Sequence, residues 1–151
     1  MKLVIRSLTP AWDAEYEVCA NPDLRFQVRT STQEKLRHIR ILDTAGNEVG
    51  HVYQNGTGVT GECRGRELLR VERRMGLLHR MIPGIQSGHF RWCSLHRGDI
   101  RKRDYDFYAN RCLVHVYSPT YGVVVEYTDH LAQPLEVLVL VLAIETIGQY
   151  T

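Results

Sequence analysis

One segment near the end of the sequence constrains the fold more than any other. From residue 137 to residue 144 the chain reads Val-Leu-Val-Leu-Val-Leu-Ala-Ile, so every position is apolar. A helix over about 134–148 would have Pro134 in its first turn and Glu136 near its positive end. It would be too short to span a bilayer of about 30 Å comfortably, so burial inside the protein is expected. The three valines also fit a buried central strand, which is the competing interpretation.

The remaining composition indicates one folded domain. The chain has 151 residues, of which 44% are hydrophobic and 24% charged, which argues against intrinsic disorder and predicts a single domain over 1–151. No apolar run approaches the roughly 20 residues of a membrane-spanning helix. The opening residues, MKLVIRSLTP, lack a signal-peptide core, so we expect a cytoplasmic protein with four reduced cysteines.

Turn signals recur at short intervals and favour many short strands. They include Asn21-Pro22-Asp23, residues 43–47, Asn55-Gly56, Pro83-Gly84, Arg97-Gly98-Asp99 and Ser118-Pro119. Between them, strand-like patterns are expected at 25–30, 38–42, 48–54, 90–95, 104–108, 113–117 and 122–127. Segment 66–82 is ambiguous, because its apolar positions fit both a helical stripe and a strand that leads into a turn at Gly76. The chain is therefore predicted to be mainly β before its apolar helix.

A weak internal repeat relates two of these β regions. Residues 26–54 align without gaps on residues 90–118, with six of 29 positions identical, and His51-Val52-Tyr53 matches His115-Val116-Tyr117. A true duplication predicts two similar β units within one domain, whereas shared strand composition would explain the match as chance. His51, Tyr53, His115 and Tyr117 are candidates for a small ligand pocket, or residues placed alike for packing reasons.

The net charge of +2 hides a strong asymmetry along the chain. Residues 63–111 hold 12 basic and 5 acidic side chains, whereas residues 112–151 hold no Lys or Arg and 4 acidic side chains. A surface that gathers the basic residues would attract phosphate on lipid headgroups or nucleic acid. The alternative is a solvated surface on which they pair with nearby Asp and Glu. The candidates for binding an anion or lipid headgroup are Arg64, Arg66, Arg70, Arg73, Arg74, Arg101, Lys102 and Arg103.

Enzyme motifs are the rival source of function, and the sequence offers little for them. It contains no Gly-x-Ser-x-Gly, His-Glu-x-x-His, Gly-x-x-x-x-Gly-Lys or Cys-x-x-Cys pattern. His89, Cys93 and His96 are spaced like metal ligands, but on one strand His96 would point away from the other two. We therefore expect no metal, no cofactor and no catalytic residue.

The order of segments resembles the LURP-one-related proteins of the tubby C-terminal-like superfamily, which is related to the phospholipid scramblases. The resemblance covers roughly residues 14–148. Its matching segments are residues 38–50, residues 66–71, Trp92, residues 103–108 and the apolar segment 134–147. It implies a closed antiparallel barrel of about twelve strands around a buried hydrophobic C-terminal helix. It also favours a strand over residues 66–74.

The resemblance and the basic middle segment together lead to one functional expectation. Tubby-like proteins bind phosphoinositides through basic surface residues, so the resemblance implies a non-catalytic binding module. The expected partner is an anionic phospholipid or a membrane surface, with the protein cytoplasmic and peripheral to the membrane. A small-molecule enzyme or ligand carrier with a surface cleft is the alternative. Nucleic-acid binding comes third, because the sequence contains no recognised reader motif.

Overall fold

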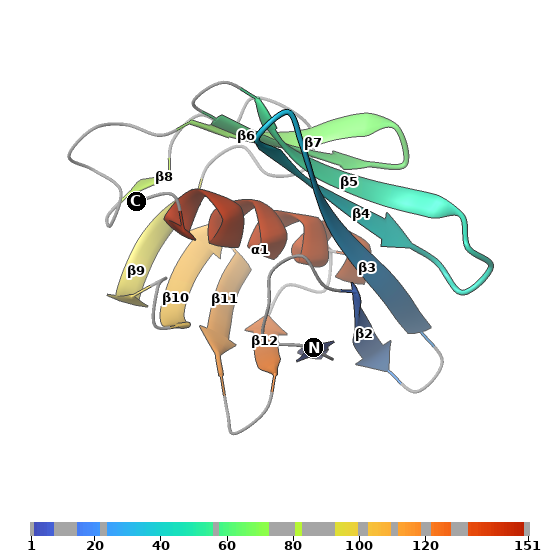
Figure 1. The fold of residues 1–151 in the computed structure, drawn as a ribbon. Helices are drawn as coiled ribbons and strands as arrows, with labels where there is room; N and C mark the ends of the chain where they lie inside the picture. The colour runs from blue at the N-terminus through green and yellow to red at the C-terminus, as the bar shows by residue number, and fades with distance from the viewer. Residues whose placement is uncertain are drawn as a thin grey trace.

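The computed structural model describes residues 2–7, 15–21, 24–55, 58–72, 81–82, 93–99, 103–109, 112–118, 122–127 and 133–149. Over these residues the chain forms twelve strands and one helix (Figure 1). The strands are β1 (Lys2–Ser7), β2 (Glu15–Asn21), β3 (Leu24–Gln33), β4 (Leu36–Leu42), β5 (Glu48–Asn55), β6 (Gly58–Cys63), β7 (Arg66–Glu72), β8 (Met81–Ile82), β9 (Cys93–Asp99), β10 (Asp104–Ala109), β11 (Cys112–Tyr117) and β12 (Val123–Tyr127). The helix is α1 (Pro134–Gln149).

The twelve strands form one antiparallel sheet, which confirms the mainly β prediction. Its order is β7-β6-β5-β4-β3-β2-β1-β12-β11-β10-β9-β8. Every pair of adjacent strands in the sheet is consecutive in the chain except β1 and β12, and β7 and β8 stand at the two ends of the order. The sheet can therefore be divided into two series of six strands. One series contains β2 to β7, and the other contains β8 to β12 together with β1. β5 and β11, which carry the two His-Val-Tyr segments, are the fourth strands of these series.

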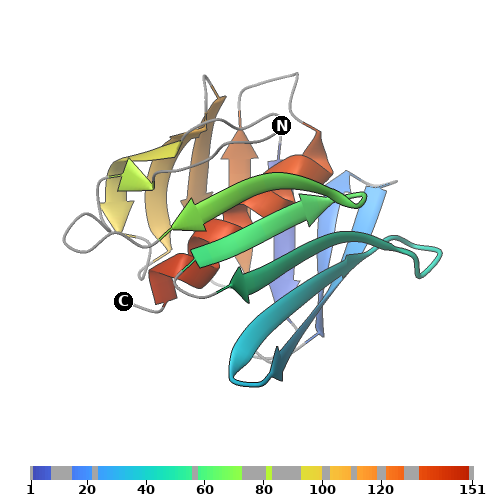
Figure 2. The same ribbon diagram turned by 90° about the horizontal axis from the view of Figure 1, so that it is seen from above.

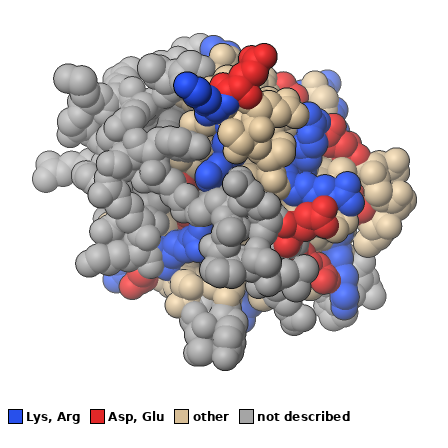
Figure 3. Space-filling model, viewed as in Figure 1, with Lys and Arg blue, Asp and Glu red and all other residues tan. Residues whose placement is uncertain are grey.

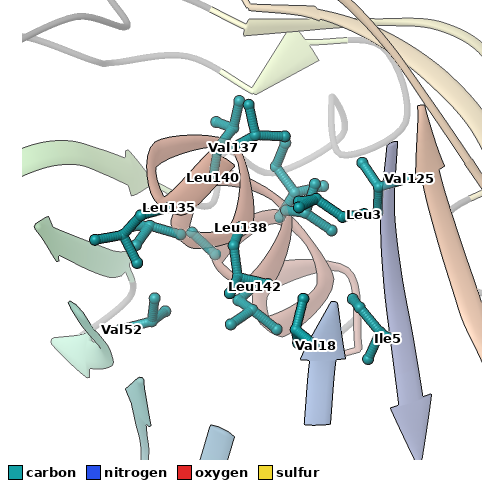
Figure 4. Close-up of a cluster of buried hydrophobic side chains, with 14 of the residues drawn as sticks. Leu3, Ile5, Val18, Val52, Val125, Leu135, Val137, Leu138, Leu140 and Leu142 are labelled. Atoms are coloured by element: carbon teal, nitrogen blue, oxygen red, sulfur yellow. The ribbon is translucent and has the colours of Figure 1, made fainter. Parts of the chain in front are cut away.

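The apolar segment forms the predicted helix, and the strand interpretation of it is wrong. α1 is enclosed by the curved sheet, with β5, β6 and β7 on one side and β9 to β12 on the other (Figures 1 and 2). Its residues 137–144 are all buried. Side chains from opposite parts of the sheet reach it, including Leu3 of β1, Val52 of β5 and Val125 of β12 (Figure 4). A helix that is apolar on every face suits this position, because no polar side is left in the core.

The close packing of α1 on the sheet depends on two glycines. A Cβ added at Gly61 of β6 would lie 2.7 Å from Cγ1 of Val139, and one at Gly50 of β5 would lie 3.3 Å from Cγ2 of the same valine. Both contacts are shorter than ordinary van der Waals distances. The missing side chains therefore leave the space that Val139 fills.

The described residues do not form the closed barrel that the resemblance implies. No pairing among them joins β7 to β8, so the sheet is open between these two strands. β8 contributes only two residues, and both pair with β9, at Ser94 and Cys93. So short a strand offers little edge for closing the sheet.

Of two local predictions, one is confirmed and one is wrong. Residues 66–72 form a strand, as the resemblance favoured, while residues 73–80 lie outside the described part of the chain. The turn predicted at Arg97-Gly98-Asp99 is wrong, because these residues end β9 and Gly98 pairs with Tyr105. Within the described residues, no helix is both long and apolar enough to cross a membrane.

Candidate functional site

A pocket of 910 Å³ lies where α1 begins, and we call it the helix-start pocket. Its volume falls in the range of small-ligand pockets, about 300–1,000 Å³. It combines an apolar lining with charged side chains. The lining residues are Leu24, Arg25, Phe26, Asp43, Thr44, Cys63, Arg64, Arg66, Glu67, Leu68, Gln133, Pro134, Leu135 and Glu136.

A tight turn between β6 and β7 places two arginines at this pocket. Arg64 and Gly65 form the turn, with φ angles of 53° and 79°, as a two-residue hairpin with two left-handed positions requires. The backbone N–H of Arg64 donates to the carbonyl of Val49 at 2.8 Å, which fastens the turn to β5. Arg64 and Arg66 are exposed, and neither forms an ion pair with another described residue.

Most other charged groups of the pocket already have partners. Arg25 pairs with Glu17 at 3.1 Å, and Glu67 pairs with Arg70 at 3.7 Å. The carboxylate of Asp43 accepts the backbone N–H groups of Ala45 and Asn47 and thereby holds the β4–β5 turn. The charges left for a ligand are therefore those of Arg64, Arg66 and Glu136.

Glu136 is the third residue of α1 and lines the pocket. Its Oε2 is shielded from solvent and has no hydrogen-bond partner among the described residues. Burial, and after it the charge of Glu136, raise the pKa of the neighbouring Cys63 thiol. Cys63 is therefore a neutral thiol at neutral pH and is unsuited to act as a nucleophile.

Four of the eight predicted basic residues lie in the described part of the chain, and these four do not form one patch. Arg64 and Arg66 lie at the start of α1, whereas Arg103 pairs with Glu145 near its end, at 3.4 Å. The eleven steps along the helix from residue 134 to residue 145 correspond to about 16 Å. Arg70 is paired with Glu67, and basic and acidic side chains are interspersed over the described part of the face shown in Figure 3. Arg73, Arg74, Arg101 and Lys102 lie outside the described residues.

Arg103 is partly exposed and belongs to a polar cluster that reaches into the core. Glu145 is buried in the last part of α1, where it accepts a hydrogen bond from the Tyr105 hydroxyl at 2.9 Å in addition to the Arg103 contact. Burial raises the pKa of Glu145, and the charge of Arg103 with the two hydrogen bonds offsets this only in part. This cluster ties α1 to β10 and is a structural feature of the core.

The two predicted histidine and tyrosine pairs lie apart. His51 and Tyr53 are on β5 and His115 and Tyr117 are on β11, with five strands between them in the sheet. In each pair the rings face away from α1, because the intervening valines, Val52 and Val116, are the buried positions. The four side chains therefore form two separate clusters on the outer face of the sheet and line no common pocket.

The cluster around His51 is an imidazole pair. His51 Nε2 lies 3.2 Å from His38 Nδ1, and the ring of Tyr53 packs against His51. Burial and the neighbouring charge of Arg40 lower the pKa of His51. Tyr53 donates to Glu62 at 3.2 Å, and burial together with that carboxylate raises its pKa.

The cluster around His115 is a row of alternating basic and acidic side chains across five strands. In register, Arg97 of β9 faces Asp106, Asp106 faces His115, His115 faces Glu126, and Glu126 faces Lys2 of β1. His115 Nδ1 is hydrogen-bonded to Asp106, which Arg97 also contacts at 2.7 Å. Burial alone would raise the pKa of Asp106, but these two neighbours outweigh it and lower the pKa.

The cross-strand neighbours of His51 and His115 differ, although the internal repeat matches the two histidines. His51 faces Arg40, whereas the ungapped alignment would place Asp104, not Asp106, opposite His115. The hairpin that joins β4 to β5 has a longer connection than the one that joins β10 to β11, which moves the register by two residues. The two histidines thus share a place in the topology but have different charged neighbours.

The chemistry available to the His115 row is limited. A carboxylate at Nδ1 orients an imidazole so that its Nε2 can accept a proton. A shallow pocket of 590 Å³ lies here, but its described lining contains no serine, threonine or cysteine to act as a nucleophile. No group of three or more His, Cys, Asp or Glu side chains among the described residues could hold a metal ion.

Sequence reasoning found Arg64 and Arg66 but missed the pocket that they flank. The sequence showed Glu136 at the positive end of the helix, yet it could not show that Leu24 and Phe26 of a distant strand lie beside it. Comparisons of the chain with protein-family models, with curated proteins and with solved structures found no match.

Proposed function

We propose that the protein is a non-catalytic, tubby-like binding module whose helix-start pocket takes the headgroup of an anionic phospholipid at a membrane surface. The observation that carries the proposal is the pair of exposed arginines, Arg64 and Arg66, beside an apolar pocket of 910 Å³. Guanidinium groups suit phosphate oxygens because they present several N–H donors in one plane. The proposed location is the cytoplasm, peripheral to a membrane.

The lining of the pocket supports a lipid over a free polar anion. Leu24, Phe26, Leu68 and Leu135 provide apolar surface next to the two arginines. An amphiphile matches both features, since its phosphate can meet the arginines while its glycerol and first methylene groups cover the leucines. The expected ligand is therefore a phospholipid presented by a bilayer.

Vesicle co-sedimentation tests this proposal. The protein should bind vesicles of phosphatidylcholine with phosphatidylglycerol and should bind pure phosphatidylcholine vesicles far less. The variant Arg64→Ala/Arg66→Ala should lower the affinity for the anionic vesicles by about tenfold to thirtyfold, because each basic residue near an anionic surface contributes about 1 kcal/mol.

The matched control is Arg29→Ala/Arg40→Ala, which removes the same charge from the outer face of β3 and β4. Arg29 and Arg40 are engaged by Glu15 and Glu48, away from the pocket. The control should retain most of the binding. Equal weak binding of the native protein to neutral and anionic vesicles would contradict the proposal, as would equal losses in both double variants.

We further propose that the sheet is a tubby-like barrel that closes between β7 and β8. The two six-strand series in one sheet and the enclosed apolar helix support this architecture. An experimental structure tests it directly: hydrogen bonds between the free edges of β7 and β8 are expected. Two edges exposed to solvent would show an open sheet instead.

A further inference from the structure

Among the described charged residues of the helix-start pocket, Glu136 is the one that has neither a partner nor a part in the proposed phosphate contact. Two of the three lining carboxylates already have partners, Asp43 in its own turn and Glu67 with Arg70. Glu136 lines the pocket, and its Oε2 is shielded from solvent and has no hydrogen-bond partner among the described residues. A buried carboxylate oxygen without a donor is costly, and a ligand donor toward which the side chain turns would remove that cost.

The position of Glu136 in the helix does not supply this donor. A glutamate at the third position of a helix often accepts the backbone N–H of the residue before the first turn. The helix begins with Pro134 preceded by Gln133, and no described N–H group bonds to the buried Oε2. Its favourable interaction with the helix dipole explains why an acidic residue is tolerated there, but it leaves this oxygen unsatisfied.

The three available groups of the pocket therefore describe a ligand with both signs of charge. Arg64 and Arg66 match a phosphate, Glu136 matches a cationic N–H donor, and the leucines match an apolar chain. We propose that the pocket recognises an aminophospholipid, with the phosphate at Arg64 and Arg66 and the primary ammonium group donating to Glu136. This inference rests on the proposed function and names the headgroup class that the same site takes.

The chemistry of the donor separates this class from other phospholipids. A primary ammonium group, as in serine and ethanolamine headgroups, offers three N–H donors, whereas the quaternary ammonium of choline offers none. The glycerol headgroup of phosphatidylglycerol carries the phosphate charge without any cation. A charge-assisted hydrogen bond to a carboxylate contributes about 1.5–3 kcal/mol, so the ammonium group should tighten binding about tenfold or more.

Two pairs of vesicles test the proposal at matched surface charge. Phosphatidylserine and phosphatidylglycerol are compared at the same mole fraction in phosphatidylcholine, and phosphatidylethanolamine is compared with phosphatidylcholine in vesicles that carry the same amount of phosphatidylglycerol. We expect about tenfold tighter binding to the amine-bearing member of each pair. Equal binding to both members of the pairs would overturn the inference.

The variant Glu136→Gln assigns the preference to this residue. It should bring the serine-to-glycerol ratio close to one and leave binding to phosphatidylglycerol vesicles unchanged or slightly stronger, because a negative charge is removed. Glu34→Gln, the same change at an exposed turn between β3 and β4, should keep the native ratio. A preference for serine that survives in Glu136→Gln would overturn the inference.

Two further measurements keep the outcomes distinct. Thermal unfolding of Glu136→Gln identifies any loss of folded protein, and retained binding to phosphatidylglycerol vesicles shows that its pocket is intact. If the native protein binds phosphatidylserine and phosphatidylglycerol vesicles equally well, and both better than phosphatidylcholine vesicles, the proposed ammonium contact is wrong but the proposed function stands. If the native protein binds neither anionic vesicle, both the proposed function and the inference are contradicted.

Discussion

At the scale of single residues, the most consequential group in the core is the carboxylate of Glu145. It lies in the buried part of α1, with Arg103 and Tyr105 as its partners. Its pKa is raised by burial, so the folded protein holds a proton on Glu145 more tightly than the unfolded chain does. The stability contributed by this group is fully present below its ordinary pKa near 4.5 and is lost as the pH rises through the higher folded value.

The raised pKa of Glu145 predicts how Glu145→Gln changes the pH dependence of the free energy of unfolding. The native protein should lose free energy of unfolding across that pH window relative to the variant, by at most about 1.4 kcal/mol per pH unit. Urea denaturation of both proteins at several pH values from about 4 to 8 measures the difference. Glu48→Gln, at an exposed carboxylate on β5 that pairs with Arg40, serves as the control for the loss of a surface charge. A native-to-variant difference that is constant with pH would show that Glu145 does not titrate differently on folding.

At the scale of elements, the sheet accommodates α1 because two strands lack side chains where the helix approaches. Gly50 and Gly61 face Val139, and the tightest distance for an added Cβ is 2.7 Å, to Cγ1 of the valine. Contacts below 3.0 Å require one of the two elements to move. The fit of helix to sheet is therefore set by a few backbone positions as well as by total apolar volume.

Gly61→Ala tests this fit. The added methyl group should lower the free energy of unfolding by about 1–3 kcal/mol, because it overpacks a well-filled core. Val139→Ala should be destabilising alone, through loss of buried methyl groups, but should partly rescue Gly61→Ala. Chemical denaturation of the two single variants and the double variant measures the coupling. Additive losses would show that the two residues do not compete for the same space.

At the scale of the whole molecule, β1 connects two series of strands that are otherwise separate in the sheet. Val4 pairs with Cys19 of β2 on one side and with Val124 of β12 on the other. The inward neighbours of Val4, Leu3 and Ile5, are both buried in the shared core. The first strand of the chain thus completes the half of the sheet that contains β8 to β12.

A proline at position 4 should destabilise both series of strands together. Val4→Pro removes a backbone donor from a central strand and clashes with its neighbours, whereas Val4→Thr keeps the N–H and nearly the same shape. Amide hydrogen exchange in β5 and β11 measures the response. We expect faster exchange in both strands for Val4→Pro and little change for Val4→Thr. Faster exchange in β11 alone would mean that the two series unfold independently.

The parts of the fold that were predicted are those encoded by local pattern. Alternation and turn residues located β3, β4, β5, β10, β11 and β12, and the unbroken apolar run located α1 at nearly its observed ends. β1, β2 and β6 were missed, and β8 lies in the ambiguous segment 66–82. β6 contains two glycines and little alternation. One of these glycines, Gly61, reflects the approach of α1, a contact between residues far apart in the sequence that no local window contains.

The candidate site was less predictable for the same reason. Charge counting singled out Arg64 and Arg66, but it gave the same weight to Arg103, which pairs with Glu145 in the interior, and to Arg70, which pairs with Glu67. The matched histidines suggested one pocket, although strand order separates them. Which charges remain unpaired depends on cross-strand neighbours, and these follow from register and hairpin length.

The enclosed helix also bears on how the protein is made. α1 follows all twelve described strands in the chain, so the ribosome produces the wall of the structure before the element that fills it. Until residues 134–149 emerge, the inward faces of β1, β5 and β12 have no helix to cover them. The growing chain therefore exposes apolar strands until α1 has been synthesised, and exposed apolar strands are a reason why nascent proteins depend on chaperones.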